Sequence, residues 1–111
     1  MKFKGMKRLL ALSLALHLNL MADRVTTTDG SVLVGQILGM QDGNLTMETE
    51  FAGKLRIAHS RIAAISSEDT FSIRLEDNRT FNGVIVSRAN GTLGLEEREM
   101  SFALNEIGQL W

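Results

Sequence analysis

The sequence predicts an all-β protein made of two tandem, small, barrel-like β units behind an N-terminal signal-peptide helix. Three observations predict it: an internal repeat, turn dipeptides at regular intervals, and alternating apolar residues between the turns. The repeat is the strongest, because the stretch from Thr28 to Met47 returns between Glu76 and Leu95. Self-similarity at such a period indicates a repeated supersecondary unit. An offset of 48 residues relates these positions: Asp29 and Asp77, Gly35 and Gly83, Gly43 and Gly91, Leu45 and Leu93.

The end of each copy follows a different offset. Ile62 corresponds to Ile107 and Ile65 to Leu110, at an offset of 45. The second copy therefore lacks three residues between its middle strand and its closing segment. Because loops tolerate deletions better than strands do, we expect a shortened hairpin loop in the second copy.

Turn dipeptides divide each copy into short antiparallel strands. Asp29-Gly30 and Asp77-Asn78 mark one turn, and residues 42–44, with their counterpart at the offset of 48, mark another. Gly and Asn tolerate the positive φ angles that tight hairpins need. Gly35 and Gly83 lie inside strands, where glycine usually marks a bend or a close backbone approach. Each copy is therefore expected to be a strongly bent sheet of about five short strands.

Ten strands follow from these turns, and half-buried strands should alternate apolar and polar residues, as Leu55 and Ile57 do with Lys54 and Arg56. In the first copy we expect strands at 24–28, 32–40, 44–49 and 54–58, and residues 60–65 as a single turn followed by a short closing strand. In the second copy we expect strands at 71–76, 80–87, 92–96, 101–104 and 107–111.

The alternation also predicts the core. The expected core residues are apolar and lie on one face of each strand: Leu33, Ile37, Leu45, Met47, Leu55, Ile57, Ile62, Ile65, Phe81, Ile85, Leu93, Leu95, Phe102, Leu104, Ile107 and Leu110. A unit of this size buries little surface alone, and the only polar interval between the copies, residues 66–69, is short. The sequence therefore predicts two units, 23–67 and 68–111, that share an interface.

Residues 1–22 differ in composition from the rest. The basic residues Lys2, Lys4, Lys7 and Arg8 precede an apolar run at 9–22, and the first acidic residue is Asp23. This order predicts a secretory signal peptide and a periplasmic protein, since the run is shorter than the roughly 20 apolar residues of a membrane span. Cleavage is expected after Ala22, although Leu20 is larger than the residue the best sites have there. The alternative is an N-terminal helix that belongs to the fold, and Met6 is an alternative start.

Removal of the signal peptide makes the chain more acidic. It takes away four of the twelve Lys and Arg residues and none of the thirteen Asp and Glu residues, so the net charge changes from −1 to −5. Such a chain, without a basic run, is a poor candidate for nucleic acid, whose phosphates require clustered Lys and Arg. The sequence has no cysteine, which excludes disulfides and a lipoprotein anchor.

The residues after the signal resemble a bacterial family. The resemblance rests on the run 23–30, Gly35, Gly43-Asn44-Leu45, residues 48–53, and Ile57 through Arg61-Ile62. These are similar to the segment that follows the signal peptide in the salt-stress-induced outer-membrane proteins, a family of unknown function. Its members continue into a C-terminal outer-membrane β-barrel that this sequence does not contain, so membrane insertion is not carried over. The resemblance covers residues 1 to about 90 and implies a periplasmic module of a Gram-negative envelope.

Each copy also resembles the Sm-like, or SH3-like, barrel pattern, with its turn, its in-strand glycine, and Gly43-Asn44-Leu45 or Gly91-Thr92-Leu93. Sm-like proteins form rings that bind RNA at a pair of loops. Their second motif, a short apolar-Arg-Gly segment, is replaced here by Ile57-Ala58-His59 and Ala103-Leu104-Asn105. This departure, the acidic balance and the export signal argue against RNA binding, so we interpret the pattern as shared barrel geometry.

His59 is the only histidine after the signal peptide. A lone histidine without a nearby Ser, Cys or second His cannot assemble a triad or a zinc site, so we expect a surface or turn histidine. With Arg56 and Arg61 it forms the only basic spot of the first copy, which fits an anionic ligand or an ordinary surface.

Three other features each have two interpretations. The acidic residues of the second copy lack the spacing of a calcium loop and are expected to be a solvated hairpin tip that discourages edge pairing: Glu96, Glu97, Glu99 and Glu106. Three asparagines begin glycosylation sequons, but in a chain that looks bacterial we interpret them as turn residues: Asn44, Asn78 and Asn90. Trp111 either caps the second core or lies exposed as an anchor for a partner.

The sequence therefore predicts a non-enzymatic, exported interaction or structural module of the bacterial cell envelope, with no catalytic residue, cofactor or metal. The expected partner is a protein or another envelope component, with no nucleic acid and no membrane span after signal removal. The expected binding surfaces are exposed edges and turns: Asp29-Gly30, Ala52-Gly53 and the hairpin 96–100. One alternative is a cytoplasmic Sm-like nucleic-acid-binding protein with an N-terminal helix, and another is an enzyme that uses His59.

Overall fold

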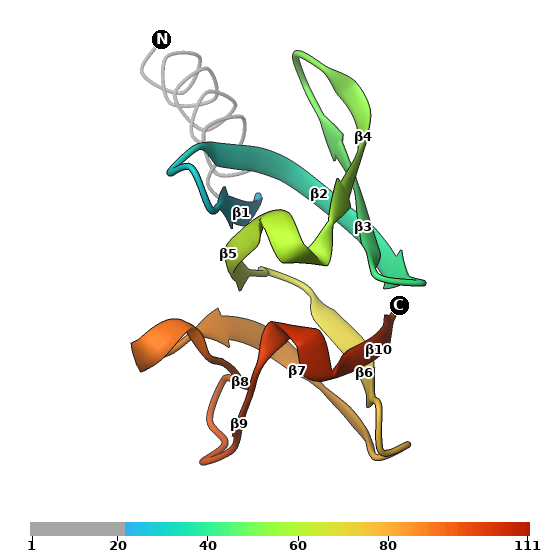
Figure 1. Ribbon diagram of the computed structural model, residues 1–111, viewed down its shortest axis with the longest axis vertical. Helices are drawn as coiled ribbons and strands as arrows, with labels where there is room; N and C mark the ends of the chain where they lie inside the picture. The colour runs from blue at the N-terminus through green and yellow to red at the C-terminus, as the bar shows by residue number, and fades with distance from the viewer. Residues whose placement is uncertain (1–21) are drawn as a thin grey trace, which may run out of the picture.

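The computed structural model describes residues 22–111, which form an all-β structure of ten antiparallel strands in one sheet. Figure 1 shows the first half of the chain, in blue and green, above the second half, in yellow and red. The first half contains β1 (Asp23–Thr27), β2 (Val32–Gln41), β3 (Asn44–Thr49), β4 (Gly53–Ala58), the 3₁₀ turn η1 (His59–Arg61) and β5 (Ile62–Ser66). The second half contains β6 (Thr70–Leu75), β7 (Thr80–Ser87), η2 (Ala89–Gly91), β8 (Leu93–Leu95), β9 (Ser101–Phe102), η3 (Leu104–Glu106) and β10 (Ile107–Leu110).

The predicted all-β class is confirmed within these residues, and the ten strands lie close to their predicted positions, except that the strand predicted at 101–104 ends at Phe102. The signal peptide predicted at 1–22 lies outside the described residues except for Ala22. None of the described residues belongs to a helix long and apolar enough to cross a membrane.

Each half has the same order of paired strands. β1 pairs with β5 and β2, β2 with β3, and β3 with β4, while β6 pairs with β10 and β7, β7 with β8, and β8 with β9. The β1–β5 and β6–β10 ladders also shift register at corresponding places. The facing residues agree with the offsets of 48 and 45: Val25 faces Leu33 and Ile65, and Ile73 faces Phe81 and Leu110.

Gly35 and Gly83 lie where the long strand of each half changes partners. β2 pairs with β1 up to Gly35 and with β3 from Gly35 onward, and β7 pairs with β6 up to Val84 and with β8 from Ile85. A Cβ atom on Gly35 would overlap the carbonyl oxygen of Glu48. The glycine therefore permits the close backbone approach at which one strand passes from one neighbour to the next.

The expected turn residues close the hairpins. Gly30 and Asn78 have φ angles of 89° and 71°. Beside them, Asp29 and Asp77 each accept a hydrogen bond at 3.1 Å from the backbone N–H two residues on. The second turn of each half also contains two residues with positive φ: Asp42-Gly43 and Asn90-Gly91. These side-chain-to-backbone bonds and positive φ values are what Asp, Asn and Gly supply in tight turns.

One cluster of buried apolar side chains extends through both halves. Most of the expected core residues are buried, and the others pack against the core while partly exposed: Leu33, Leu55, Ile57, Phe81 and Leu104. The expected list omits further residues that are buried: Val25, Met40, Phe71, Ile73 and Leu75. β1 and β6 each lie between two strands, which covers their inward side chains, and Met40 is covered by β10 from the other half.

Two sets of contacts join the halves. β10 pairs with β2 at Met40 and Gln41. On the other side of the junction, the backbone N–H of Ser67 donates to the carbonyl of Ile85 at 2.9 Å, and the Ile85 N–H donates to the Ser67 Oγ at 2.9 Å. The Ser87 hydroxyl donates to the carbonyl at the end of β5 at 3.1 Å. The polar interval between the copies is therefore fixed to β7.

The side chain of Asp23 binds the connection between the halves to the first half. Asp23 is 2% exposed. One carboxylate oxygen accepts the N–H of Ile37 at 2.8 Å and the other accepts the N–H of Glu68 at 2.9 Å. The buried carboxylate and both N–H groups have hydrogen-bond partners although they are shielded from water. These bonds hold β1, β2 and the segment before β6 together.

β2 contains a bulge that the alternation does not predict. Ile37 faces Met47 but Gly39 faces Thr46, so Leu38 is an extra residue on β2. The corresponding part of β7 keeps a regular register against β8. The second half also differs from expectation at 101–104, because β9 ends at Phe102 and the chain turns into η3. The predicted shortening of the hairpin loop is wrong: residues 96–100 separate β8 from β9, whereas only residues 50–52 separate β3 from β4, so the second half has shorter strands and not a shorter loop.

Replacement of Gly35 by alanine is expected to lower the free energy of unfolding by about 3 kcal/mol or more, because the new methyl group overlaps backbone atoms of β3. Gly108→Ala is the matched control, since the nearest atom to a Cβ there is at an ordinary distance of 3.4 Å. Urea unfolding followed by circular dichroism measures both. Equal unfolding midpoints for the two variants would contradict the role given to Gly35.

Candidate functional site

A groove lies on the outer face of the sheet where the two halves meet. It is lined by residues of β2, β3 and β4 from the first half and by the end of β10 from the second. The apolar part of the lining consists of Leu38, Met40, Leu55, Leu110 and Trp111, and the charged part of Asp42, Lys54 and Arg56. We call this surface the junction groove.

The bulge in β2 shapes the junction groove. As the extra residue, Leu38 points outward and is 43% exposed. Next to it, a Cβ atom on Gly39 would lie 2.8 Å from the carbonyl oxygen of Leu110, so only glycine allows β10 to approach this closely. Bulges commonly redirect side chains beside functional sites. Here the bulge presents Leu38 and admits the strand that carries Trp111.

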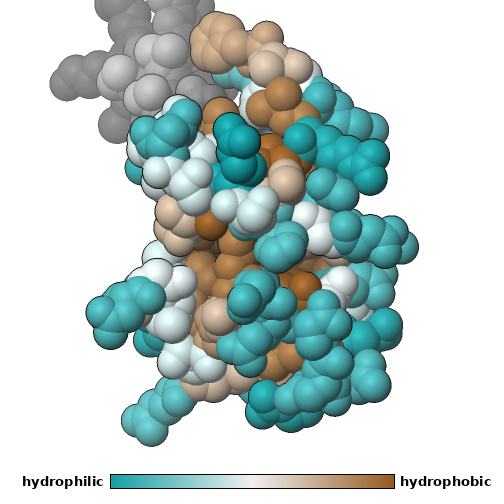
Figure 2. Space-filling model, in the orientation of Figure 1, coloured by the Kyte–Doolittle hydropathy of each residue, from teal (hydrophilic) through white to brown (hydrophobic). Residues whose placement is uncertain are grey.

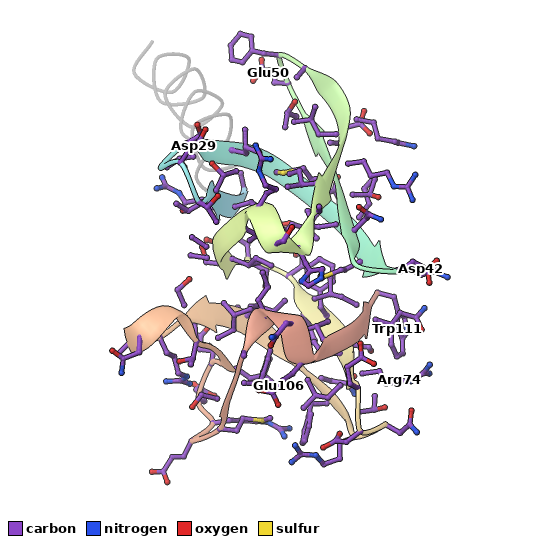
Figure 3. The ribbon with its side chains drawn as sticks, in the orientation of Figure 1. Asp29, Asp42, Glu50, Arg74, Glu106 and Trp111 are labelled. Atoms are coloured by element: carbon purple, nitrogen blue, oxygen red, sulfur yellow. The ribbon has the colours of Figure 1, made fainter. Side chains whose placement is uncertain are left out.

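Trp111 is held at the edge of the groove by its backbone. Its N–H donates to the carbonyl of Ser72 at 3.0 Å, and the Ser72 N–H donates to its carbonyl at 2.9 Å. The side chain is 47% exposed and does not belong to the core cluster. The guanidinium of Arg74 lies 5.3 Å from the indole centroid and donates to the Gln109 side chain at 3.2 Å. Figure 3 shows Trp111 and Arg74 together at the end of β10.

Of the two interpretations of Trp111, the core cap is therefore wrong. The stacked Arg74 orders the exposed ring without burying it, because a cation over an indole face is an attractive contact that leaves the other face open. An ordered, half-exposed tryptophan beside an exposed leucine has the composition of a binding hot spot.

The β4 side of the groove carries two of the cations of the acidic first half. Lys54 and Arg56 are exposed on β4, and the one ion pair within residues 22–111 is Arg79–Asp77 in the second half. Glu48 faces Lys54 across the β3–β4 ladder, and Asp42 lies at the end of the groove. The lining therefore contains two solvated cations and one carboxylate, and the stacked Arg74 and the carboxylate of Glu48 lie beside it.

The second half has a hollow at the corresponding place, and the side chain of Arg88 forms part of its lining. Its lining residues stand at offsets of 48 and 45 from residues of the junction groove: Ser87, Arg88, Ala89, Asn90, Thr92 and Ser101. Arg88 replaces Met40, and its guanidinium lies across Gly94 and donates to the carbonyls of Leu95 and Arg98, both at 2.8 Å. The two hollows therefore differ, and of the two only the junction groove is lined by an aromatic side chain.

The other candidate residues have structural roles or remain apart. The N–H of His59 donates to the carbonyl of Gly43 at 2.8 Å, and its ring lies against Gly43, as expected of a turn histidine. Arg56 and Arg61 line a shallow hollow beside the Asp29 turn, which His59 does not join. The Glu106 carboxylate accepts the N–H of Ala103 at 2.9 Å within η3. Within residues 22–111, no three His, Cys, Asp or Glu side chains are placed to hold a metal ion.

None of the three predicted binding surfaces contributes to the lining of the junction groove. The Asp29-Gly30 turn is closed on itself by hydrogen bonds, and the hairpin 96–100 is held by Arg88. The Ala52-Gly53 turn carries Phe51, which is 99% exposed near Val32 and Val34. Figure 2 shows hydrophobic surface at the top of the first half and again between the halves. Trp111 and the cations of β4 are the residues of the junction groove that stand out in the sequence. The alternation of apolar and polar residues does not predict that they lie close together.

The pKa of Asp29 is lowered from 3.8 to about 2, chiefly by the hydroxyl of Thr27 and next by the N–H of Ser31. A lowered folded-state pKa stabilises the fold above the unfolded-state value, and this contribution is lost as the pH falls from about 4 to about 2. Thr27→Val should raise the pKa of Asp29 toward its ordinary value, as measured by NMR titration. Asp77 is the internal control, because its pKa is lowered by Arg79 and not by Thr27. If the pKa of Asp29 were the same with and without Thr27→Val, the Thr27 hydroxyl would not be the main cause of the lowered pKa.

The chain matches no known protein family, no curated protein and no solved structure. The resemblance to the salt-stress-induced outer-membrane proteins therefore stays a prediction from the sequence. The chemistry and geometry of the junction groove are the basis for the function proposed below.

Proposed function

We propose that this chain is a non-enzymatic, exported interaction module of the bacterial cell envelope and that it holds a partner protein in the junction groove. The observation that carries the proposal is the half-exposed indole of Trp111, fixed by Arg74 beside the exposed side chain of Leu38. Tryptophan and arginine are over-represented among residues that dominate binding energy. An exposed tryptophan that is held in one orientation loses little conformational entropy when a partner covers it.

The proposal includes the architecture predicted from the sequence, in which residues 23–67 and 68–111 are two copies of one SH3/Sm-like unit. The common pairing order, the corresponding registers and the shared register shift support this interpretation. The equivalent turns at Asp29 and Asp77 support it further, because they repeat the same side-chain-to-backbone hydrogen bond.

The junction between the copies is reciprocal. The end of β2 in the first copy meets β10 of the second, and β7 of the second copy meets the end of β5 in the first. β2 corresponds to β7 and β5 to β10, and the equivalent turns η1 and η3 lie against each other. An exchange of equivalent elements is the pattern of an isologous, two-fold interface. We infer that the chain is the fused equivalent of a symmetric dimer whose two grooves later diverged.

The cytoplasmic Sm-like nucleic-acid binder is the second candidate. Trp111 with Arg74 and the cations of β4 favours it, because bases stack on exposed aromatic rings beside a basic groove. The acidic balance of the whole chain opposes it, since nucleic acids require a surplus of Lys and Arg. We therefore place it second.

Export predicts that the chain recovered from cells begins at Asp23 and is found in the periplasmic fraction. Osmotic-shock fractionation followed by intact-mass measurement tests this, with a cytoplasmic enzyme as the leakage control. A cytoplasmic chain that still carries residues 1–22 would contradict export and favour the nucleic-acid binder.

The binding proposal predicts that a photocrosslinking amino acid at Leu38 captures a defined partner in intact cells. Capture should fall at least about tenfold when Trp111 is replaced by alanine, and the same crosslinker at Ala89, an exposed residue in the hollow of the second half, should capture no partner. Mass spectrometry of the crosslinked band is the measurement. Equal capture from both positions, or capture that is indifferent to Trp111→Ala, would contradict a site in the junction groove.

A further inference from the structure

The junction groove has a defined length and two chemically different ends. Across the sheet, Arg56 on β4 faces Thr46 on β3, and Thr46 faces Gly39 on β2. Gly39 in turn lies against the carbonyl group of Leu110 on β10. Trp111 follows directly. This row of residues spans three strand-to-strand spacings of about 4.8 Å, so the cationic end and the aromatic end lie about 14 Å apart.

The β4 end of the groove is suited to an acidic side chain. Lys54 and Arg56 are exposed and lie on the same face of β4, because they are two residues apart. The charged groups around the groove are three cations and two carboxylates: Lys54, Arg56, Arg74, Asp42 and Glu48. The local sum is +1, whereas residues 23–111 together carry −5. The groove is therefore net cationic on a chain that is net acidic, so it attracts an anionic side chain.

The β10 end is suited to a large apolar side chain. Leu38 and Trp111 are each more than two-fifths exposed, while Met40 and Leu110 are buried beneath them. Between the two ends the lining is uncharged and polar, with Asn44, Thr46, Gln41 and Gln109. Side-chain amides and hydroxyls of this kind can bind the backbone N–H and C=O groups of a chain that crosses the strands.

An extended chain rises about 3.3 Å per residue, so about four residues span the distance from Arg56 to Trp111. We propose that the junction groove binds an extended segment of a partner protein in which an acidic side chain and a large apolar side chain are three to five positions apart. The segment crosses β4, β3, β2 and β10, with the acid on Arg56 and Lys54 and the apolar group between Leu38 and Trp111. This inference rests on the function proposed above and specifies the chemistry of the partner.

The test is a selection of random, tryptophan-free decapeptides on the purified full-length chain, followed by titration of synthetic copies. Trp111 is the only tryptophan in the chain, so its fluorescence reports on the groove. We expect the selected peptides to carry Asp or Glu three to five positions from Leu, Ile, Met or Phe. Arg56→Glu should weaken their binding at least about tenfold, because a charge-assisted contact becomes a repulsive one.

Arg98→Glu is the matched control, because it makes the same change of charge on an exposed residue outside the groove. It should change the affinity by no more than about twofold. The affinity of a labelled peptide for the Trp111→Ala variant is measured by fluorescence polarisation. This measurement establishes whether peptide binding requires the tryptophan.

The outcomes separate the two levels of the proposal. Peptides that require Trp111 but show no acidic preference would overturn the partner chemistry and leave the groove as the binding site. If no selected peptide alters Trp111 fluorescence, both the partner chemistry and the proposed function fail. Arg56-dependent binding of a dT12 oligonucleotide, or Arg56-dependent self-association of the chain, would assign the groove to nucleic acid or to a second copy and overturn the inference.

Discussion

The reciprocal contact between the two halves is the constraint on which the rest of the structure depends. A five-stranded unit of this size buries too little apolar surface to be stable with much margin. Here strands of the two halves bind each other at two places: β10 pairs with β2, and the segment after β5 hydrogen-bonds to β7. The buried side chains of both halves consequently belong to one cluster. Asp23 reinforces this arrangement, because its carboxylate binds backbone N–H groups on β2 and on the connection between the halves.

The same contact creates the candidate site. The bulge at Leu38 and Gly39 lets β10 approach β2, and that approach brings the C-terminal tryptophan beside side chains of β4, which lies far from it in sequence. The corresponding hollow in the second half is built differently. There β7 has a regular register and Arg88 spans the hollow to bind two carbonyls. The first half has an exposed tryptophan anchor at this place, whereas the second half has the internal hydrogen bonds of Arg88.

The strands could be predicted well because the signals for them are local. Turn residues with positive φ and the alternation of apolar residues specify where each strand begins and ends without reference to the rest of the fold. The core was predicted less completely, since burial of Val25 and Ile73 depends on a strand on either side, and burial of Met40 on a strand from the other half. The junction groove could not be predicted. An extra residue in β2 leaves the sequence repeat unbroken, and the exposure of Trp111 follows from tertiary pairing with Ser72, which no local pattern encodes.

Native-state hydrogen exchange most directly tests the claim that the two halves form one cooperative structure. The backbone amides of β1 and β6, which each lie between two other strands, should open with the same free energy. Both values should fall together in Gly39→Ala, whose added methyl group lies 2.8 Å from the carbonyl oxygen of Leu110 at the junction. Different opening free energies for β1 and β6, with only one of them sensitive to Gly39→Ala, would show that the halves fold independently and would contradict the account.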